Sequence, residues 1–352
     1  MRVAVLSSTP PSPTEGSGTF VAVDGLIRGL TRLGHEVGFR TLGVRTGFYT
    51  LDRLIYNVAV AARPPVADIV VGVDLDGFLW ARRAPRAPFV VALKGIIADE
   101  LRNERGCTRA LLGVQARWER ASVHRADRVV VPSRYSAWVA AEAYGIPSAR
   151  IAVVPEPIDL GQWRRRLGAA ERVPSTRPTV LSVARMYRRK RLDDLLRAAA
   201  ILRTRIPDVQ VRIVGAGPMF DRLRRLHGDL ALDDSVIFLG EVSRARLSVE
   251  YVRADCFCLP TVQEGFGLVF AEAMAAGLPV VACHAAAVPE IVADGQTGLL
   301  VNPERPDELA TALEKLLTNP GLRKEFGEEA RRRVETYDLD RVARLFLEAV
   351  PR

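Results

Sequence analysis

Short runs of aliphatic residues alternate along most of the chain with longer stretches in which apolar side chains recur at helical spacing. The runs predict buried strands near residues 3–7, 36–42, 68–73, 89–93, 128–131 and 151–154, and again near 179–183, 210–214, 236–239, 256–259, 280–282 and 298–301. Strands that are apolar throughout and are separated by helices are typical of parallel sheets with both faces covered. The pattern therefore predicts an α/β protein with two Rossmann-like, doubly wound parallel-sheet domains, followed by C-terminal helices.

The alternation stops between residues 162 and 178, where the chain is polar, rich in arginine and without an apolar period. We therefore expect an N-terminal domain over 1–161, a linker over 162–178 and a C-terminal domain over 179–335. The last residues, 336–352, are expected to form a helix that is able to pack back onto the N-terminal domain. Ligands of open α/β sheets bind at the carboxyl ends of the strands, so we expect a site in a central cleft between the domains.

Composition narrows the class of protein. The net charge is +9, but the excess is spread over both halves and is not interleaved with aromatic residues, so we expect no nucleic-acid partner. The four cysteines form no disulfide framework, and Cys256 and Cys258 fall within a strand that is expected to be buried. The sequence contains neither a signal-peptide pattern nor a run apolar enough to span a bilayer. We therefore expect a cytoplasmic protein, with a peripheral contact to anionic lipid left open.

Two motifs that suit phosphate and sugar chemistry follow strands of the second domain. Arg185 and Lys190 come after the strand near 179–183, and cations beside a helix N-terminus favour a phosphate. Glu264 begins the motif Glu-Gly-Phe-Gly, and the pattern predicts a helix over 265–276 that places Glu272 on the same face as Glu264. Taken alone, each motif also fits a simpler explanation: a solvated basic turn, or a capping glutamate followed by a solvated one.

A dinucleotide site is the main alternative. Gly215 and Gly217 follow a strand and precede a helix, but Phe220 stands where the third glycine of Gly-x-Gly-x-x-Gly is expected. A tight structural turn is therefore favoured over a nicotinamide or flavin site, and an NAD(P)- or flavin-dependent oxidoreductase stays as the competing function. No P-loop motif occurs, and the histidines show no metal-ligand spacing.

The order and spacing of these motifs resemble the family 4 retaining glycosyltransferases of GT-B fold along essentially the whole chain. The resemblance rests on Arg185 with Lys190, on Glu264 with Glu272, and on the segments 16–18, 33–37, 214–218, 238–242 and 289–298. It implies transfer of a sugar from a nucleotide-diphosphate donor to an acceptor that the sequence does not identify. It also implies retention of anomeric configuration and no metal or other cofactor. A non-catalytic GT-B binding protein is the third hypothesis.

The resemblance assigns a role to each matching residue. Glu264, Arg185 and Lys190 would be catalytic, with Arg185 and Lys190 holding the leaving diphosphate and Glu264 beside the donor sugar. We add Lys94, which departs from the family pattern, as a fourth catalytic candidate. The donor would be bound by Gly16, Gly18, Gly240, Val242, Phe266, Gly267, Leu268 and Glu272. Within that set, Glu272 would hold the ribose, and Gly240 and Val242 would meet the base through the main chain.

Two departures from the family pattern are informative. Lys94-Gly95 stands where many members carry His-Gly, and we hypothesise that Lys94 contacts the donor sugar, its phosphate or an acidic acceptor. The simpler alternative is a strand-end lysine in solvent. Residues 154–159 replace a frequent Asn-Gly-Val-Asp. The arginine-rich helix 109–125, with Trp118, fits either a membrane surface that presents a lipid-linked acceptor or a solvated face. No motif indicates an oligomeric state.

Overall fold

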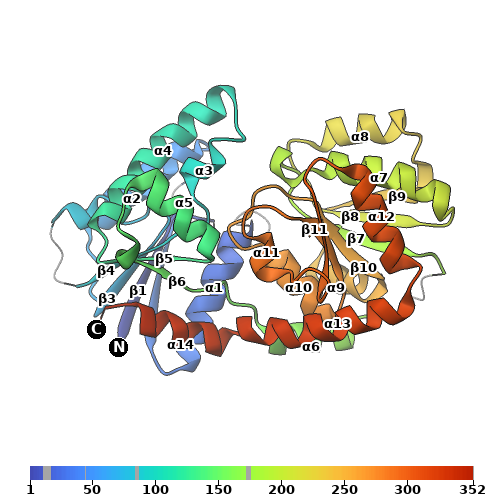
Figure 1. Ribbon diagram of the computed structural model, residues 1–352. Coiled ribbons are helices and arrows are strands. Elements are labelled where there is room, and N and C mark those ends of the chain that lie inside the picture. The colour runs from blue at the N-terminus through green and yellow to red at the C-terminus, as the bar shows by residue number, and fades with distance from the viewer. Residues whose placement is uncertain (11–16, 44, 84–86, 172–175, 352) are drawn as a thin grey trace. The chain divides into compact units, whose positions relative to one another are not determined.

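The computed structural model describes residues 1–10, 17–43, 45–83, 87–171 and 176–351 (Figure 1). The chain divides into two compact units, which we describe separately. Unit 1 comprises Met1–Ile158 and Tyr337–Arg352, and unit 2 comprises Asp159–Thr336. Each unit contains one six-stranded sheet, and the paired strands run parallel. The predicted fold class, two doubly wound α/β domains, is confirmed.

Unit 1 has the strand order β2-β1-β3-β4-β5-β6. Its strands are β1 (Arg2–Ser7), β2 (Glu36–Thr41), β3 (Ile69–Val73), β4 (Phe89–Ala92), β5 (Arg128–Val131) and β6 (Ile151–Val153). Its α-helices are α1 (Ser17–Arg32), α2 (Tyr49–Ala62), α3 (Ile97–Glu100), α4 (Gly106–Arg125), α5 (Arg134–Tyr144) and α14 (Leu339–Ala349). Short 3-10 helices cover Trp80–Arg83 and Ser148–Arg150.

Both faces of the unit 1 sheet are covered because its central strands are apolar at every position. On one face, Val70 and Val91 pack in a core with Tyr56 of α2. On the other face, Val71 packs in a core with Leu26 of α1 and with Val342, Ala343 and Phe346 of α14. Side chains that point to both faces are thus removed from water, as the continuous apolar runs predicted.

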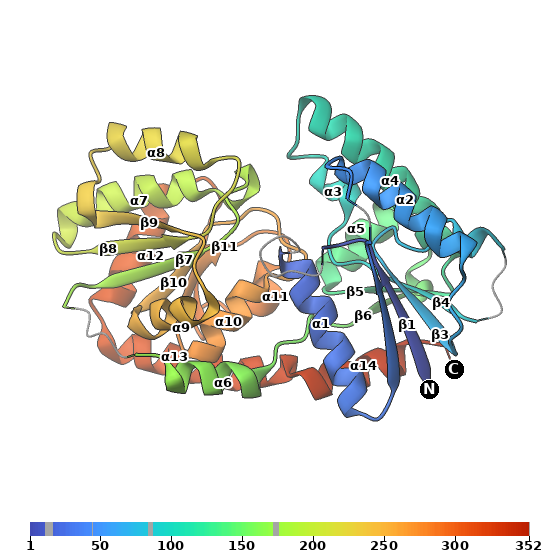
Figure 2. The same cartoon turned by 180° about the vertical axis from the view of Figure 1, so that it is seen from behind.

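The C-terminal helix α14 belongs to unit 1, although more than 170 residues of unit 2 precede it. It lies alongside α1, as both views of the ribbon show (Figure 2). A side chain at Gly29 of α1 would place its Cβ 2.8 Å from the Leu339 carbonyl oxygen and 2.9 Å from the Ala343 Cβ. The absence of a side chain at Gly29 is therefore what lets the two helices approach.

Unit 2 has the strand order β12-β11-β10-β7-β8-β9. Its strands are β7 (Thr179–Val183), β8 (Gln210–Val214), β9 (Val236–Gly240), β10 (Cys256–Leu259), β11 (Val280–Cys283) and β12 (Gly298–Val301). Its α-helices are α6 (Leu160–Ala169), α7 (Leu192–Arg205), α8 (Phe220–Asp229), α9 (Arg244–Arg253), α10 (Leu268–Ala276), α11 (Val288–Ile291), α12 (Pro306–Leu317) and α13 (Pro320–Val334). The 3-10 helices are Arg188–Lys190, Asp233–Ser235 and, at the border with unit 1, Glu335–Tyr337.

The boundary between the units differs from the expected linker over 162–178. Much of that segment forms α6, which belongs to unit 2. Asp159 begins the helix by accepting a hydrogen bond from the Gln162 backbone N–H at 2.9 Å, and Leu160 and Trp163 bury one side of it. The prediction missed this helix because most of its other positions are arginine, glycine and glutamine, which leave only a short apolar stripe.

Candidate active site

The candidate site lies at the point where the connections of the unit 2 sheet change direction. From β7 the chain continues outward through β8 and β9, then crosses back to β10 on the other side of β7 and continues through β11 and β12. The loops that follow β7 and β10 therefore leave neighbouring strands in opposite directions. In open α/β sheets this switch point forms a crevice at the carboxyl ends of the strands, where ligands bind.

Lys190 and Glu264 meet at this switch point. The Lys190 ammonium, from the loop after β7, forms an ion pair with Glu264 Oε1, from the loop after β10. Their side chains are only 12% and 10% exposed, so the pair is largely shielded from water. The Val262 backbone N–H also donates to the Arg189 carbonyl oxygen at 3.0 Å. The structure thus joins two predicted residues that are 74 positions apart in sequence.

Further cationic side chains gather in the loop after β7. The guanidinium carbons of Arg185 and Arg189 lie 5.8 Å and 5.4 Å from the centre of the Tyr187 ring. Contacts of this kind restrict the orientation of an arginine while keeping its positive charge. With Lys190, these arginines concentrate positive charge at the switch point, which suits an anionic ligand.

The loop after β8, which contains Gly215 and Gly217, packs against the loop after β7. A Cβ on Gly215 would lie 2.1 Å from the Ala184 carbonyl oxygen, and one on Gly217 would lie 2.7 Å from the Met186 nitrogen. The Met186 N–H donates to the Ala216 carbonyl oxygen at 2.9 Å. The two glycines are needed for this close backbone contact, which supports the prediction of a structural turn over a dinucleotide site.

The position of Glu264 corrects the prediction of two acids on one helix. Helix α10 begins only at Leu268, so Glu264 lies in the preceding loop and the shared helical face does not exist. The reason is Gly267, whose φ of 90° interrupts the helical conformation. A Cβ at this position would also lie 2.7 Å from the Phe270 side chain. Leu268 opens the helix, so Gly267 and Leu268 flank an N-terminus whose dipole favours an anion. Phe266, in the same loop, has a buried side chain.

Glu272 is half-buried in α10 and is held by a partner that the sequence did not reveal. The Tyr251 hydroxyl of α9 donates a hydrogen bond to Glu272 Oε2 at 3.0 Å. Burial raises the pKa of Glu272 to about 7, while the Tyr251 hydrogen bond and the charges of Arg244 and Arg166 lower it in part. Trp163 of α6 packs edge-on against the Tyr251 ring, 5.4 Å between centres. The segment expected to be a linker therefore supports this part of the site.

Gly240 and Val242 lie at the end of β9 on the same side of the sheet. Gly240 has a φ of 65°, and its carbonyl oxygen accepts a hydrogen bond from the Gly215 N–H at 2.8 Å. The loops after β7, β8 and β9 are thus linked by backbone hydrogen bonds. Val242 is half-buried before α9 begins. The site residues predicted in the second domain therefore lie in strand-end loops of one sheet edge or in α10.

The site residues predicted in unit 1 are Gly16, Gly18 and Lys94, and the structure describes two of them. Gly16 lies outside the described residues, and Gly18 lies in the first turn of α1 rather than in a loop. Lys94 lies just after β4, where its ammonium contacts Glu156 Oε2 at 2.7 Å, so it is not a solvated strand-end lysine. Glu156 was not predicted as a site residue, and its place after β6 gives no local signal for this contact.

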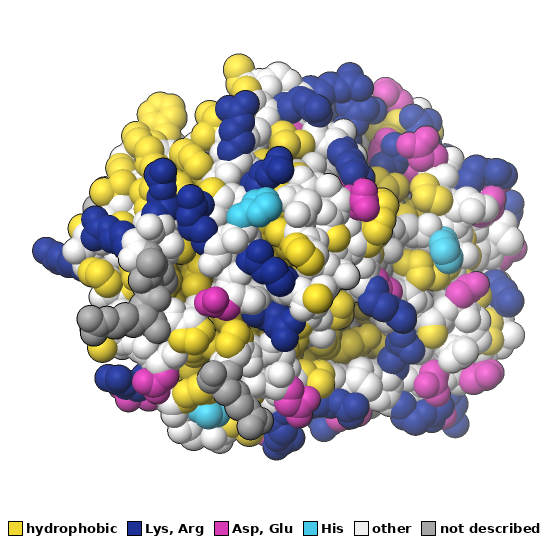
Figure 3. Space-filling view, turned by 60° about the vertical axis from the view of Figure 1, so that its left-hand side comes forward, with side chains coloured by type: hydrophobic (Ala, Val, Ile, Leu, Met, Phe, Trp, Pro, Cys, Tyr) yellow, Lys and Arg dark blue, Asp and Glu magenta, His cyan; other side chains and the backbone are white. Residues whose placement is uncertain are grey.

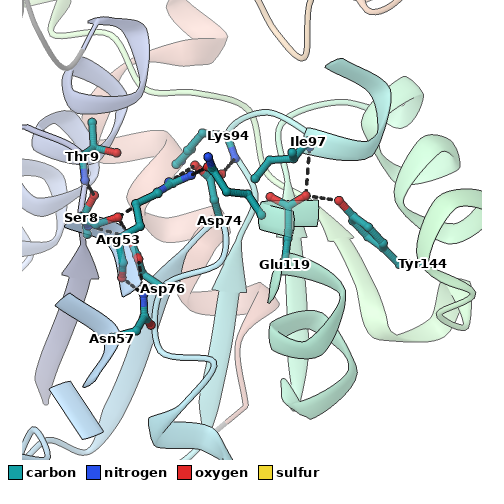
Figure 4. A network of polar contacts seen from close by, with 12 residues as sticks. Ser8, Thr9, Arg53, Asn57, Asp74, Asp76, Lys94, Ile97, Glu119 and Tyr144 are labelled. Carbon is teal, nitrogen blue, oxygen red and sulfur yellow. Dashed lines mark hydrogen bonds and ion pairs between the residues drawn. The ribbon is translucent and has the colours of Figure 1, made fainter. Parts of the chain in front are cut away.

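Lys94 adjoins a buried polar network at the carboxyl edge of the unit 1 sheet (Figure 4). Its backbone N–H donates to Asp74 Oδ1 at 2.8 Å, and Asp74 Oδ2 lies 3.7 Å from Arg53. Arg53 in turn donates to Ser8 Oγ, and the Ser8 N–H donates to Asp76 at 2.6 Å. Burial raises the pKa of Asp76 to about 6, although Arg53 and the Ser8 hydrogen bonds lower it in part. The network fixes the loops that follow β1, β3 and β4.

Other predictions from the sequence can be compared with the structure. Cys256 and Cys258 are fully buried in β10, as expected, and burial raises the pKa of both thiols. Trp118 of α4 stacks on Phe78 with 5.5 Å between ring centres, so its ring packs against the protein. Among the described residues there is no group of three or more His, Cys, Asp or Glu side chains placed to hold a metal ion.

Comparison with known proteins gives the family. Residues 16–162 match the model of Glycosyltransferase Family 4, and residues 164–333 match the model of Glycosyl transferases group 1. A GDP-mannose-dependent alpha-(1-6)-phosphatidylinositol monomannoside mannosyltransferase of Mycolicibacterium smegmatis is 35% identical over 55% of this chain and 54% of its own length. The chain spans about half the length of the curated relatives it matches.

Solved structures share the fold. Sucrose-phosphate synthase of Thermosynechococcus elongatus superimposes with a TM-score of 0.80 at 22% identity, covering 99% of this chain and 97% of the other. HepE of Anabaena, in complex with UDP, gives a TM-score of 0.73 at 20% identity, covering 99% and 98%. Together, the two family models match nearly the whole chain. The chain belongs to the family 4 glycosyltransferases of GT-B fold.

Proposed function

We propose that the protein transfers a sugar from a nucleoside-diphosphate sugar to a hydroxyl group of an acceptor, with retention of anomeric configuration. The observation that carries the proposal is the Lys190–Glu264 pair at the switch point, because it places a cation for a diphosphate beside a carboxylate for a sugar. Family membership supports it, as does the mannosyltransferase relative, which is GDP-mannose-dependent.

In this proposal the diphosphate binds to Arg185 and Lys190 and to the N-terminus of α10. Breaking the bond between the sugar C1 and the diphosphate places negative charge on the leaving oxygens, which preorganised cations and backbone N–H groups stabilise. The N–H groups of Phe266, Gly267 and Leu268 would serve this purpose. Because these groups supply the positive charge, we propose that transfer needs no metal.

The rest of the donor would be bound around this centre. Glu264 would accept a hydrogen bond from the donor sugar, and Glu272 would accept hydrogen bonds from the ribose hydroxyls. Gly240 and Val242 would contact the base through the main chain. Gly16 and Gly18 would contribute from unit 1. The acceptor oxygen would form its bond to C1 on the face that the diphosphate leaves, and the acceptor proton would pass to a departing phosphate oxygen.

The test is a screen of UDP-, GDP- and ADP-sugars by calorimetry, followed by acceptor trials with the donor that binds. GDP-mannose comes first because of the relative's name. Glu272→Ala should weaken binding of the free nucleoside diphosphate, whereas Glu264→Ala should mainly lower turnover. Transfer should survive a chelator, and NMR of the product should show the donor's anomeric configuration. An inverted product, or bound nicotinamide or flavin with no sugar-nucleotide binding, would contradict the proposal.

We also propose that the acceptor is lipid-linked and that unit 1 contacts an anionic membrane surface. The exposed large apolar side chains of the described residues all lie in unit 1: Met1, Phe48, Tyr49, Leu51, Val58, Val66, Leu111, Val114, Trp138, Val153 and Leu345. Tyr49, Leu51 and Val58 lie on α2, which ends at the exposed Arg63. Figure 3 shows one face of the protein, on which apolar and basic side chains lie intermixed. No helix among the described residues could cross a membrane.

Lipid-vesicle cosedimentation tests this contact. The protein should bind vesicles that contain anionic lipid, and binding should weaken as salt screens the arginines. Leu51→Glu with Val58→Glu should reduce binding, whereas the same change at Val153, on the strand β6, serves as the matched control. Equal binding to neutral vesicles, or no effect of the α2 substitutions, would contradict the assignment of α2. The proposal places the protein in the cytoplasm, at the inner face of the membrane.

A further inference from the structure

A pocket in unit 1 opens between α2, α4 and the 3-10 helix Trp80–Arg83. Its volume of about 350 Å³ is within the range of small-molecule sites. Phe78 and Trp118 form one wall, where their rings are stacked with 9° between the two planes. The other apolar residues that line it are Leu54, Leu79 and Ala121. None of the lining residues is assigned to the donor site, so this pocket is separate from that site.

Two buried hydrogen bonds hold α2 and α4 together beside the pocket. Arg53 of α2 donates to Gln115 Oε1 of α4 at 2.9 Å, and Gln115 Nε2 donates to Thr50 Oγ1 of α2 at 2.8 Å. Leu54 directly follows Arg53, and Trp118 lies about one helical turn after Gln115, so these bonds fix the helices at the level of the pocket. A pocket formed in advance lowers the cost of ordering the protein around a ligand.

Apolar side chains continue from the pocket along the surface of both helices. They recur every three or four residues, a spacing that places them on one face of a helix. On α4 they are Leu111, Val114, Trp118 and Ala121, and on α2 they are Leu51, Leu54 and Val58. Leu111 and Leu51 are 52% and 45% exposed, so the apolar path runs from solvent into the pocket. A path of this length suits a flexible chain better than a compact ring.

The polar groups that line the pocket are all hydrogen-bond donors. They are the guanidinium groups of Arg82 and Arg125 and the indole N–H of Trp118, and no lining side chain carries an acceptor. Both arginines are exposed, whereas Phe78 is buried, so the positive charges lie at the mouth. Within the described residues, neither arginine forms an ion pair with a carboxylate. The pocket therefore suits a ligand with an apolar body and an anionic end, whereas a base or a sugar would leave its own donors unpaired.

We propose that this pocket binds one acyl chain of an anionic lipid, with the phosphate of the head group beside Arg82 and Arg125. The donor-only lining and the charge at the mouth favour the phosphate, and the apolar path favours the chain. The inference rests on the membrane contact in the proposed function, and it names the ligand that this contact would recognise. Preference for anionic lipid would then depend on these two arginines in particular.

Calorimetry with hexyl, octyl, decyl and dodecyl phosphate, each below its micelle-forming concentration, tests the pocket. Affinity should rise about fourfold for each added methylene while the chain still fits the pocket, and should then level off. Ala121→Phe fills the pocket and should weaken dodecyl phosphate binding roughly tenfold or more. Arg82→Gln with Arg125→Gln should weaken it by a similar factor. Dodecyltrimethylammonium has the chain but a cationic head, so it should bind this double variant no more weakly than the wild type.

Two matched substitutions on α4 separate binding in the pocket from effects at the surface. Ala110→Phe adds the same ring at an exposed alanine, and Arg120→Gln removes an exposed arginine; neither residue lines the pocket. Both proteins should bind dodecyl phosphate as the wild type does. A folded Ala121→Phe protein that also binds it as tightly would overturn the inference. If that variant does not fold, an unchanged affinity of the double arginine variant would overturn it.

Other occupants of the pocket give different results. If phenyl phosphate binds as tightly as dodecyl phosphate, the pocket recognises an aromatic ring; if the protein sediments as a dimer that Ala121→Phe dissociates, the pocket receives a second copy of the chain. Either result would overturn the inference. Vesicle binding without saturable binding of alkyl phosphates would also overturn it but leave the membrane contact standing. Absence of both would overturn the contact as well, and sugar transfer tests the rest of the proposed function separately.

Discussion

Replacing Glu272 with glutamine is expected to stabilise unit 2 at neutral and alkaline pH while weakening nucleotide binding. Glutamine has the shape of the carboxylate and can still accept the hydrogen bond from Tyr251, but it cannot ionise. The substitution therefore isolates the charge of one half-buried residue. Any change in stability with pH that depends on that charge should disappear.

The magnitude follows from the pKa of Glu272. Burial raises this pKa from its ordinary 4.5 to about 7. At about 1.4 kcal/mol for each pKa unit, the ionised carboxylate destabilises the folded protein by about 3 kcal/mol. The penalty is absent below pH 4.5, where Glu272 is protonated in the folded and unfolded states. It grows as the pH rises towards 7 and is complete above that value.

The assay is urea unfolding of ligand-free wild type and Glu272→Gln between about pH 5 and about pH 8.5. The free energy of unfolding should be similar at the acidic end, and the variant should exceed the wild type by about 3 kcal/mol at the alkaline end. Glu250 is the control with the opposite sign. Burial opposes its ionisation, but hydrogen bonds and charge from Arg212 and Arg246 outweigh burial and lower its pKa. Glu250→Gln should therefore destabilise most at neutral and alkaline pH.

A difference between wild type and Glu272→Gln that stays constant over this pH range would refute the reasoning. A binding measurement gives a second, independent check. If ionised Glu272 accepts the ribose hydroxyls, the nucleoside diphosphate should bind more tightly as the pH rises through about 7, with release of a proton. The Glu272→Gln protein should bind more weakly and show no such dependence.

Further substitutions test the rest of the site. Lys190→Met should lower kcat/KM by roughly 10²–10³, because it removes the positive charge that contacts the diphosphate. Glu264→Gln should keep the affinity for the nucleoside diphosphate while lowering turnover. Equal effects of the two substitutions on binding would contradict separate roles. Tyr251→Phe should raise the Glu272 pKa further, so the midpoint of pH-dependent nucleotide binding should move to higher pH; an unmoved midpoint would contradict the hydrogen bond. Gly215→Ala should destabilise the protein by several kcal/mol, since its Cβ would meet the Ala184 oxygen. Gly228→Ala has open space around it and should be neutral or stabilising by up to about 1 kcal/mol. Thermal unfolding of the two variants distinguishes these outcomes.

The strand pattern was sufficient to predict the fold because parallel strands buried on both faces leave a clear apolar signal. The same pattern predicted that Lys190 and Glu264 lie at one edge of the sheet, because both motifs follow strand ends. The start of the helix after Glu264 was predicted wrongly, because apolar periodicity does not reveal a single residue with a left-handed backbone conformation such as Gly267. Helix α6 was missed because a ten-residue helix buries only Leu160 and Trp163.

The partners of the site residues lay beyond sequence reasoning. Tyr251 contacts Glu272 from a neighbouring helix, and nothing in its local sequence distinguishes it from a core tyrosine. Glu156 was noticed as part of an unusual segment, but its contact with Lys94 spans 62 positions and two strands that are not neighbours. Side-chain pairs of this kind depend on the exact height of each loop above the sheet, which a hydrophobic pattern does not encode.

The two lysine–glutamate pairs are expected to respond differently to substrate because their carboxylates are held differently. Each carboxylate balances the charge of the ammonium that it contacts. Glu264 lies in a glycine-containing loop beside α10, so an arriving diphosphate can take its place on Lys190 and leave Glu264 to the sugar. Glu156 lies between two prolines that pack against α1, so it keeps Lys94. Lys190 would thus exchange partners during binding, whereas Lys94 would keep its partner.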